Sequence, residues 1–182
     1  MNIVKSLDQY DDSYIYFCDP IKNNVINDGN FIRLIYSPLM FVLNGISLHI
    51  PLHNVYYDRY YNKYKCSFNV ATHKELIEKI KVIESRLLTL SPIKNKIPQF
   101  KINDQLNNGN IKIFVENTLE NNPVVFQSFH HTHTHTPYFV LKISGVWETE
   151  THYGLTYKFV KTMKRITYSQ PPPQPQPIQQ LL

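Results

Sequence analysis

The chain has 182 residues, of which 42% are hydrophobic and 18% charged, and it contains 13 Tyr, 10 Phe and 1 Trp. This length accommodates one ordinary domain with tails but not two full domains, and the hydrophobic share excludes disorder throughout the chain. The formal net charge of +5 divides into −3 over residues 1–28 and +8 over the remainder. A basic body rich in tyrosine is a candidate for binding a polyanion, although charge alone does not decide it.

Cysteine usage and the absence of targeting signals indicate an intracellular protein that is not secreted. Cys18 and Cys66 lack CxxC spacing; they could form one disulfide, but nothing indicates an oxidising compartment. The N-terminus has no basic region followed by an apolar run. The longest apolar stretch, Leu39–Leu43, is too short to cross a bilayer, so no membrane partner is expected.

In chain order, residues 1–29 are predicted to form an acidic N-terminal extension. Its acids would either compete with a polyanion for the basic body or form a solvated leader. Three stretches rich in β-branched and aromatic residues follow and predict strands, with Ser37-Pro38 and Asn44-Gly45 as breaks or turns. These stretches are Phe31–Tyr36, Phe41–Ile50 and Tyr64–Val70.

A single amphipathic helix is predicted over residues 73–90. Thr72 and Glu75 have the spacing of a capping box, Glu75 and Lys79 form a favourable i,i+4 pair, and Ser91-Pro92 ends the helix. Such a helix must bury its apolar stripe, most simply on a sheet. The stripe consists of Leu76, Ile80, Ile83, Leu87 and Leu90.

After the helix, residues 91–110 are predicted to form a linking loop with one helical turn at Asn103–Asn107, followed by alternating strands at 111–115, 139–144 and 155–159. The predicted order is three strands, a helix and then further strands. An OB-fold, which is a Greek-key barrel, has this order of elements. The predicted fold is therefore mainly β with one α-helix, an OB-fold-like barrel of five to six strands over residues 30–168. An α+β sandwich with the same order is the alternative. Residues 169–182 are predicted to be a disordered Pro/Gln-rich tail, which could also tether a partner.

The stretch 55–68 interleaves tyrosines with basic residues. If residues 60–69 are extended, Tyr61, Lys63, Lys65 and Ser67 share one face. A ring beside cations suits a single nucleic-acid strand, because bases stack at roughly 1–3 kcal/mol each while Lys and Arg neutralise phosphates. The alternative is a tyrosine-rich hairpin with a structural role only.

Two further basic groups accompany this stretch. The first lies in and after the last strand, with Lys142 expected across the hairpin from Lys158; its members are Lys158, Lys161, Lys164 and Arg165. The second is in the linking loop and consists of Lys94, Lys96 and Lys101. One such cluster is more often a solvated face than a site, whereas three clusters indicate a shared basic groove.

Signals for catalysis and metal binding are weak. Alternate histidines could chelate a divalent ion, but no Cys lies near and the Thr alternation before Pro137 favours a polar loop, so no metal or cofactor is predicted. Glu148 and Glu150 could hold magnesium in a nuclease but lack a partner acidic motif, and no GxSxG, Gly-rich phosphate loop or HExxH occurs. We predict a protein that is not an enzyme. The histidines in question are His130, His131, His133 and His135.

The block Phe139–Val160 carries two distinctive patterns, K-x-SG-x-W at Lys142 to Trp147 and GLTYKF at Gly154 to Phe159. It resembles the C-terminal hairpin of single-stranded-DNA-binding proteins of large nucleo-cytoplasmic DNA viruses, a group similar to the phage T7-type single-strand binder. The resemblance covers residues 30–168. It implies an OB-fold that coats single strands in viral DNA replication, recombination or repair, in the host cytoplasm (viral factory) or nucleus, and that recruits replication proteins. T7-type binders end in an acidic tail with a terminal aromatic residue, whereas this chain ends in QPPPQPQPIQQLL.

We therefore predict a non-catalytic, sequence-tolerant binder of single-stranded DNA. The candidates for base stacking are Tyr57, Tyr60, Tyr61 and Trp147, and those for phosphate contact are Arg59, Lys63, Lys65, Lys142, Lys158 and Lys161. The alternative is a virion or scaffold protein that binds other proteins through a β-barrel and the Pro/Gln tail, and a metal-dependent nuclease ranks last. The sequence leaves open the preference for DNA or RNA and the oligomeric state, a homodimer included.

Overall fold

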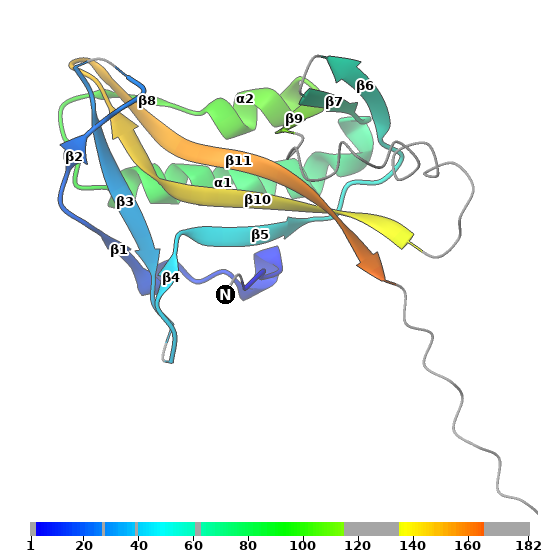
Figure 1. Ribbon diagram of the computed structural model, residues 1–182, viewed down its shortest axis with the longest axis horizontal. Coiled ribbons are helices and arrows are strands. Elements are labelled where there is room, and N and C mark those ends of the chain that lie inside the picture. The colour runs from blue at the N-terminus through cyan, green and yellow to red at the C-terminus, as the bar shows by residue number, and fades with distance from the viewer. Residues whose placement is uncertain (1–2, 27, 39, 61–62, 115–134, 166–182) are drawn as a thin grey trace, which may run out of the picture.

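The computed structural model describes residues 3–26, 28–38, 40–60, 63–114 and 135–165 (Figure 1). Before the long helix the elements are η1 Leu7–Gln9, η2 Asp12–Tyr14, β1 Ile15–Phe17, β2 Ile21–Lys22, β3 Asn30–Tyr36, β4 Leu43–Asn44, β5 Ile46–Ile50, β6 Tyr56–Tyr60, β7 Lys63–Ser67 and η3 Ala71–His73. From the long helix onward they are α1 Lys74–Leu90, β8 Ile97–Gln99, α2 Lys101–Asn107, β9 Asn110–Phe114, β10 His135–Glu148 and β11 His152–Arg165. The predicted Pro/Gln tail lies outside the described residues.

Eleven strands of the described ranges form one mixed sheet, whose main order is β1-β3-β10-β11-β9-β7-β6. The antiparallel hairpin of β10 and β11 is its centre. β10 pairs with β5 along its first part and with β3 near its end, whereas β11 pairs with β8 and β9 in parallel. The short strands β2 and β4 both pair with β3.

The mainly β class with one long helix is confirmed, but the OB-fold-like barrel is not, because the sheet is not closed. β10 and β11 each have 14 residues, more than twice the length that the alternation predicted. A hairpin this long pairs with different strands at its two ends, so the sheet spreads along it. The predicted helical turn at Asn103–Asn107 is part of a second helix, α2.

The long helix α1 begins one residue later than predicted and ends at Leu90 as expected. The first four residues of the predicted apolar stripe are buried, whereas Leu90 is 41% exposed. The predicted capping box is wrong: Thr72 lies in η3, where its hydroxyl donates to the Asn69 carbonyl, and the residue at the N-cap of α1 is His73. The helix start is therefore set by the turn at 69–73.

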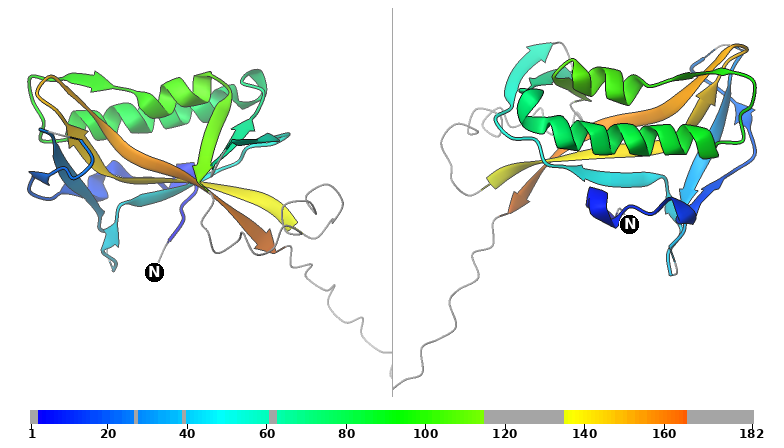
Figure 2. Two further views of the ribbon diagram at one scale, coloured as in Figure 1. Left: turned by 45° about the horizontal axis from the view of Figure 1, so that its top comes forward. Right: turned by 180° about the vertical axis from the view of Figure 1, so that it is seen from behind.

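Both helices cover one face of the sheet, and the core lies between the two layers (Figure 2). Fully buried side chains from β3, β5 and β10 meet those of α1, among them Leu34, Leu48, Leu141, Ile80 and Leu87. The opposite face of the sheet carries no helix in the part of the chain that the structure describes. Of the two cysteines, Cys66 is buried and Cys18 is exposed, and both are free thiols.

The acidic N-terminal residues lie against the folded domain. β1 pairs with β3, and Lys5 forms a bridge to β5. Lys79 Nζ on α1 lies 3.2 Å from carboxylate oxygens of both Asp8 and Glu75, the second being the predicted i,i+4 pair. Arg86, about two helical turns further on, pairs with Asp12 at 2.8 Å. Two of the leader's acids are thus held on α1, on the helix side of the sheet.

Candidate functional site

Strand alternation sorts the side chains of the sheet onto two faces. In β10, Leu141 and Ile143 are buried toward the helices, so Lys142 between them points to the opposite side. We call that side the helix-free face; Figure 1 looks onto it, and the right-hand view of Figure 2 looks onto the helices. A bulge just after Ile143 shifts the alternation by one residue. As a result Val146 is buried and Trp147 belongs to the helix-free face.

Four lysines stand in one line across this face. Lys142 and Lys158 are directly opposite each other in the β10–β11 ladder, as the hairpin prediction required. Lys65 and Lys112 are directly opposite each other in the β7–β9 ladder. We call these four residues the lysine row. Lys65, Lys112 and Lys158 are exposed and Lys142 is half-buried.

The two lysine pairs are joined where β11 meets β9. These strands pair in parallel at Phe159 and Ile113, both of which are buried toward the helices. Because successive side chains alternate between faces, Lys158 and Lys112, each one residue earlier, lie side by side on the helix-free face. The row therefore crosses β10, β11, β9 and β7 without interruption, and Asp58 of β6 stands at its end.

The lysine row has an electrostatic cost within the chain. Like charges directly opposite each other in a ladder destabilise the strand pair by up to about 1 kcal/mol. Within the described ranges, none of the four ammonium groups takes part in an ion pair. A polyanion laid across the row would offset this repulsion, since each phosphate would neutralise charge that the fold leaves in place.

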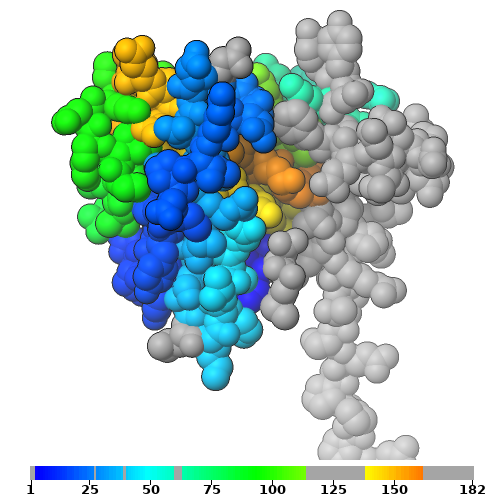
Figure 3. Space-filling view, turned by 60° about the vertical axis from the view of Figure 1, so that its left-hand side comes forward, coloured from blue at the N-terminus to red at the C-terminus, as the bar shows by residue number. Residues whose placement is uncertain are grey.

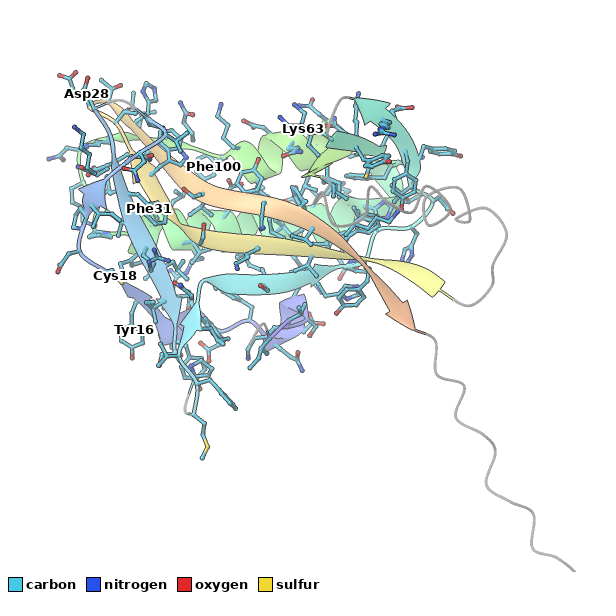
Figure 4. The ribbon with its side chains drawn as sticks, in the orientation of Figure 1. Tyr16, Cys18, Asp28, Phe31, Lys63 and Phe100 are labelled. Carbon is cyan, nitrogen blue, oxygen red and sulfur yellow. The ribbon has the colours of Figure 1, made fainter. Side chains whose placement is uncertain are left out.

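The remaining predicted basic and aromatic residues divide between the two faces. Lys63 shares the helix-free face with the lysine row and is exposed, and Trp147 lies on the same face near β3. Tyr57 and Arg59 alternate onto the other side of β6. The side chain of Tyr60, and the whole of Tyr61, lie outside the described residues. Figure 4 shows Lys63 on β7, far across the sheet from Phe31 on β3.

Lys161 lies on the helix side, where it contacts Tyr57 instead of solvent. Its Nζ is 3.9 Å from the centre of the Tyr57 ring, a cation–π contact. Burial lowers the pKa of Lys161 to about 8 and raises the pKa of Tyr57. The structure therefore places these two predicted site residues together, but away from the lysine row.

Several residues of the helix-free face were not predicted as site residues. They are Tyr56, which is 75% exposed, Lys112, Arg33, Phe31, and the stacked rings of His49 and Tyr138, whose centres are 4.1 Å apart. The alternation of Lys112 with Ile111 and Ile113 is a signal that could have identified it. The others depend on which strands are neighbours, which the sequence does not reveal.

Next to the lysine row, Phe31 and Trp147 are directly opposite each other on β3 and β10 and border an open hollow of about 530 Å³. Arg33 and Thr156 line it from the sheet, and residues 21–26 form its outer wall. The Arg33 guanidinium carbon lies 5.9 Å from the centre of the Phe31 ring. The hollow therefore combines aromatic surface with a cation.

The acids considered for a nuclease have structural partners. Glu148 accepts hydrogen bonds from Lys96 and from the Asn30 amide, and these bonds, with that from Lys96 the stronger, lower the pKa of its carboxyl. Glu150 is exposed in the β10–β11 turn. No group of three potential metal ligands occurs among the described residues. The first three histidines of the cluster, and the side chain of His135, lie outside them.

An exposed apolar tip is the other notable surface feature. Met40 is 85% exposed, Phe41 50% and Val42 74%, and all three lie in the turn between β3 and β4. The turn projects from the molecule at the foot of Figure 3. Tyr16 on the neighbouring β1 is 57% exposed. A projecting apolar turn is a feature of contacts with other proteins.

Comparison of the chain with protein-family models, with curated proteins and with solved structures found no significant match. In the part of the chain that the structure describes, no helix is both long and apolar enough to cross a membrane.

Proposed function

We propose that this protein binds single-stranded DNA, without catalysis and with little regard to sequence, across its helix-free face. The observation that supports the proposal most directly is the lysine row, in which two pairs of lysines are directly opposite each other and form no ion pair within the described residues, although Asp58 is the ladder neighbour of Lys65. The aromatic side chains on the same face offer surfaces on which bases stack. Lys63 and Arg33 extend the positive charge to either side.

A single strand suits this face better than a duplex. Aromatic rings can stack only on bases that are unpaired and turned outward, and every base has a face for such stacking. The resemblance of the C-terminal hairpin to viral single-strand binders gives the same expectation. We extend the proposal to a role in viral DNA replication, recombination or repair inside the host cell.

The test is a titration of oligo-dT against the full chain at several salt concentrations, following the emission of Trp147 and Tyr. If the lysine row contacts four phosphates, log K should fall with log [salt] with a slope of about −2.8. The double variant Lys65→Ala/Lys112→Ala should bind about tenfold or more weakly at low salt, with a slope shallower by about 1.4.

The matched control is Lys74→Ala/Lys81→Ala, which removes the same charge from α1, on the other side of the sheet. This control should bind within about twofold of the wild type, because the charge lies away from the proposed strand. Equal weakening by both double variants would show that net charge alone acts, and binding that ignores salt would contradict the proposal outright.

The alternative of a protein-binding scaffold is favoured by the apolar tip at 40–42, whose three exposed side chains face solvent. It predicts stable complexes between protein chains that do not depend on DNA. Size-exclusion chromatography with and without oligo-dT, on the wild type and on Met40→Ser/Val42→Ser, separates the two functions. Assembly lost in this variant, with no oligonucleotide dependence, would favour the scaffold.

A further inference from the structure

We propose that the hollow beside Phe31 and Trp147 holds one unstacked nucleobase of the strand that crosses the lysine row. This inference rests on the proposed function and specifies which part of the strand is bound there. It predicts that the protein distinguishes a strand with bases from a sugar-phosphate chain without them. Charge on the lysine row alone would not make that distinction.

The floor of the hollow is built so that each of its two aromatic rings lies over a glycine of the sheet. The rows of the ladders run from Ile21 through Phe31 and Trp147 to Gly154. A Cβ at Gly154 would stand 2.8 Å from the Trp147 ring, so only glycine leaves the indole room to cover that strand. At Gly145 a Cβ would overlap the Phe31 ring and the backbone of β3. Two of the five glycines of the chain thus lie beneath the two rings.

The rim of the hollow is positive. Its described lining includes Lys22 and Arg33 and contains no acidic residue. Arg33 is exposed, donates to the Asn44 side chain at 3.0 Å and lies over Phe31. An apolar interior with a cationic rim complements a base attached to a phosphate chain, whereas an apolar protein side chain would gain nothing from the cations.

The hollow and the lysine row are close enough for one strand. Gly154 and Lys158 are four residues apart on β11, which corresponds to about 13 Å at the rise of a β-strand. Thr156 on the same face lies between them and lines the hollow. A strand of a few nucleotides would therefore reach from the lysine row into the hollow, with its backbone over β11.

The experiment compares two oligonucleotides of equal length, oligo-dT and the same sugar-phosphate chain with abasic residues throughout. Competition against a fluorescein-labelled oligo-dT gives both affinities. For the wild type we expect oligo-dT to bind about fivefold or more tightly than the abasic chain, since stacking contributes roughly 1–3 kcal/mol per base. In Phe31→Ala this ratio should fall toward one, through loss of affinity for oligo-dT only.

Two further variants serve as a second change within the hollow and as a control outside it. Ile21→Ser changes an exposed side chain on the wall, 56% accessible, and should reduce the ratio without endangering the fold. Phe41→Ala removes an aromatic ring whose exposure, 50%, is similar to that of Ile21. Because Phe41 lies in the distant β3–β4 turn, this variant should leave the ratio of the two affinities unchanged. Circular dichroism confirms that each variant is folded.

The outcomes separate the two proposals. If the wild type binds both chains equally, or if Phe31→Ala weakens both alike, the hollow is not a base site, although Lys65→Ala/Lys112→Ala can still show that the lysine row binds the strand. If neither chain binds at low salt, the proposed function fails and the inference fails with it. Preservation of the ratio in both Phe31→Ala and Ile21→Ser also overturns the inference.

Discussion

Replacing Glu84 by leucine should destabilise the protein by about 2–4 kcal/mol. Glu84 lies in the middle of α1 and is 1% exposed. Its carboxylate oxygens accept hydrogen bonds from the backbone N–H groups of Ile102, at 3.0 Å, and Asn103, at 2.8 Å. These groups belong to the first turn of α2, where no carbonyl of the same helix is available. Leucine has a comparable volume but offers no acceptor.

The magnitude follows from the burial of the two donors. A hydrogen bond to a charged group contributes about 1.5–3 kcal/mol, and a buried group left unsatisfied costs about 1–3 kcal/mol. Ile102 is buried and would bear this cost in full, whereas Asn103 is half-buried and water can replace part of its bond. Leucine also avoids the desolvation of a carboxylate, which limits the total.

The measurements are urea unfolding, for the free energy, and thermal unfolding, for the melting temperature, each followed by far-UV circular dichroism. For a domain of this size the melting temperature should fall by about 4–16 °C. Glu78→Leu is the matched control, because Glu78 is exposed on the same helix and its ion pair within the described residues, with Lys81, is exposed too. It should change the free energy of unfolding by no more than about 0.5 kcal/mol. A loss below about 1 kcal/mol for Glu84→Leu would refute the capping role.

The pH dependence of the same site has a definite sign. Burial, with a smaller contribution from Asp104, raises the pKa of Glu84 against the opposing effect of the two N–H bonds. The folded-state pKa of the Glu84 carboxyl lies above its unfolded-state pKa. The contribution of this pKa difference to the free energy of unfolding is therefore complete below the ordinary pKa near 4.5, and it is lost as the pH rises through the raised pKa. Glutamine keeps an acceptor and does not ionise. The free energy of unfolding of the wild type relative to Glu84→Gln should therefore fall as the pH rises above 4.5, and a constant difference would contradict this reasoning.

Three further changes test other parts of the fold. His73→Ala should cost about 1–3 kcal/mol in urea unfolding, because the buried His73 ring accepts from the His53 backbone N–H at 3.0 Å. The free energy of unfolding of the wild type relative to Lys161→Met should rise between pH 8 and 10, since a pKa lowered to about 8 means that unfolding takes up a proton there; a flat difference would place Lys161 in solvent. Gly154→Ala should shift the emission of Trp147 and cost about 1–3 kcal/mol, since the new Cβ meets the indole at 2.8 Å; an unchanged spectrum would count against that contact.

The elements whose burial follows a strong local period could be predicted from the sequence. The stripe from Leu76 to Leu87 predicted α1 to within one residue, and the alternation around Ile111 and Leu141 predicted β9 and part of β10. Whether the sheet closes into a barrel or stays open could not be predicted, because that depends on which strands pair. β10 has different neighbours at its two ends, and no local pattern distinguishes the residues that meet β5 from those that meet β3.

The candidate site shows the same division. The parity of strand positions is enough to place Lys63 and Lys65 on one face. Lys142 is opposite Lys158 only because the bulge after Ile143 shifts the register of the hairpin by one residue, and no local pattern indicates that bulge. Parity also separates Lys161 from Lys158, since three residues along a regular strand lead to the opposite face. The sequence prediction grouped the two by charge without applying this rule. The placement of Lys112 next to Lys158 depends on the parallel contact of β9 with β11, a pairing between distant segments.

The acids of the N-terminal extension have defined places in the structure. Both alternatives considered for it assumed that its acids are either in solvent or on the basic surface. Asp8 and Asp12 pair with Lys79 and Arg86 on α1, and the side chain of Asp8 remains 82% exposed, so its pairing is compatible with a solvated leader. These exposed pairs contribute little stability, about 0–1 kcal/mol each, but they keep negative charge on the helix side of the sheet. The described acids of the leader that pair therefore do so away from the lysine row, and each of them neutralises a cation of α1 and not a lysine of the row.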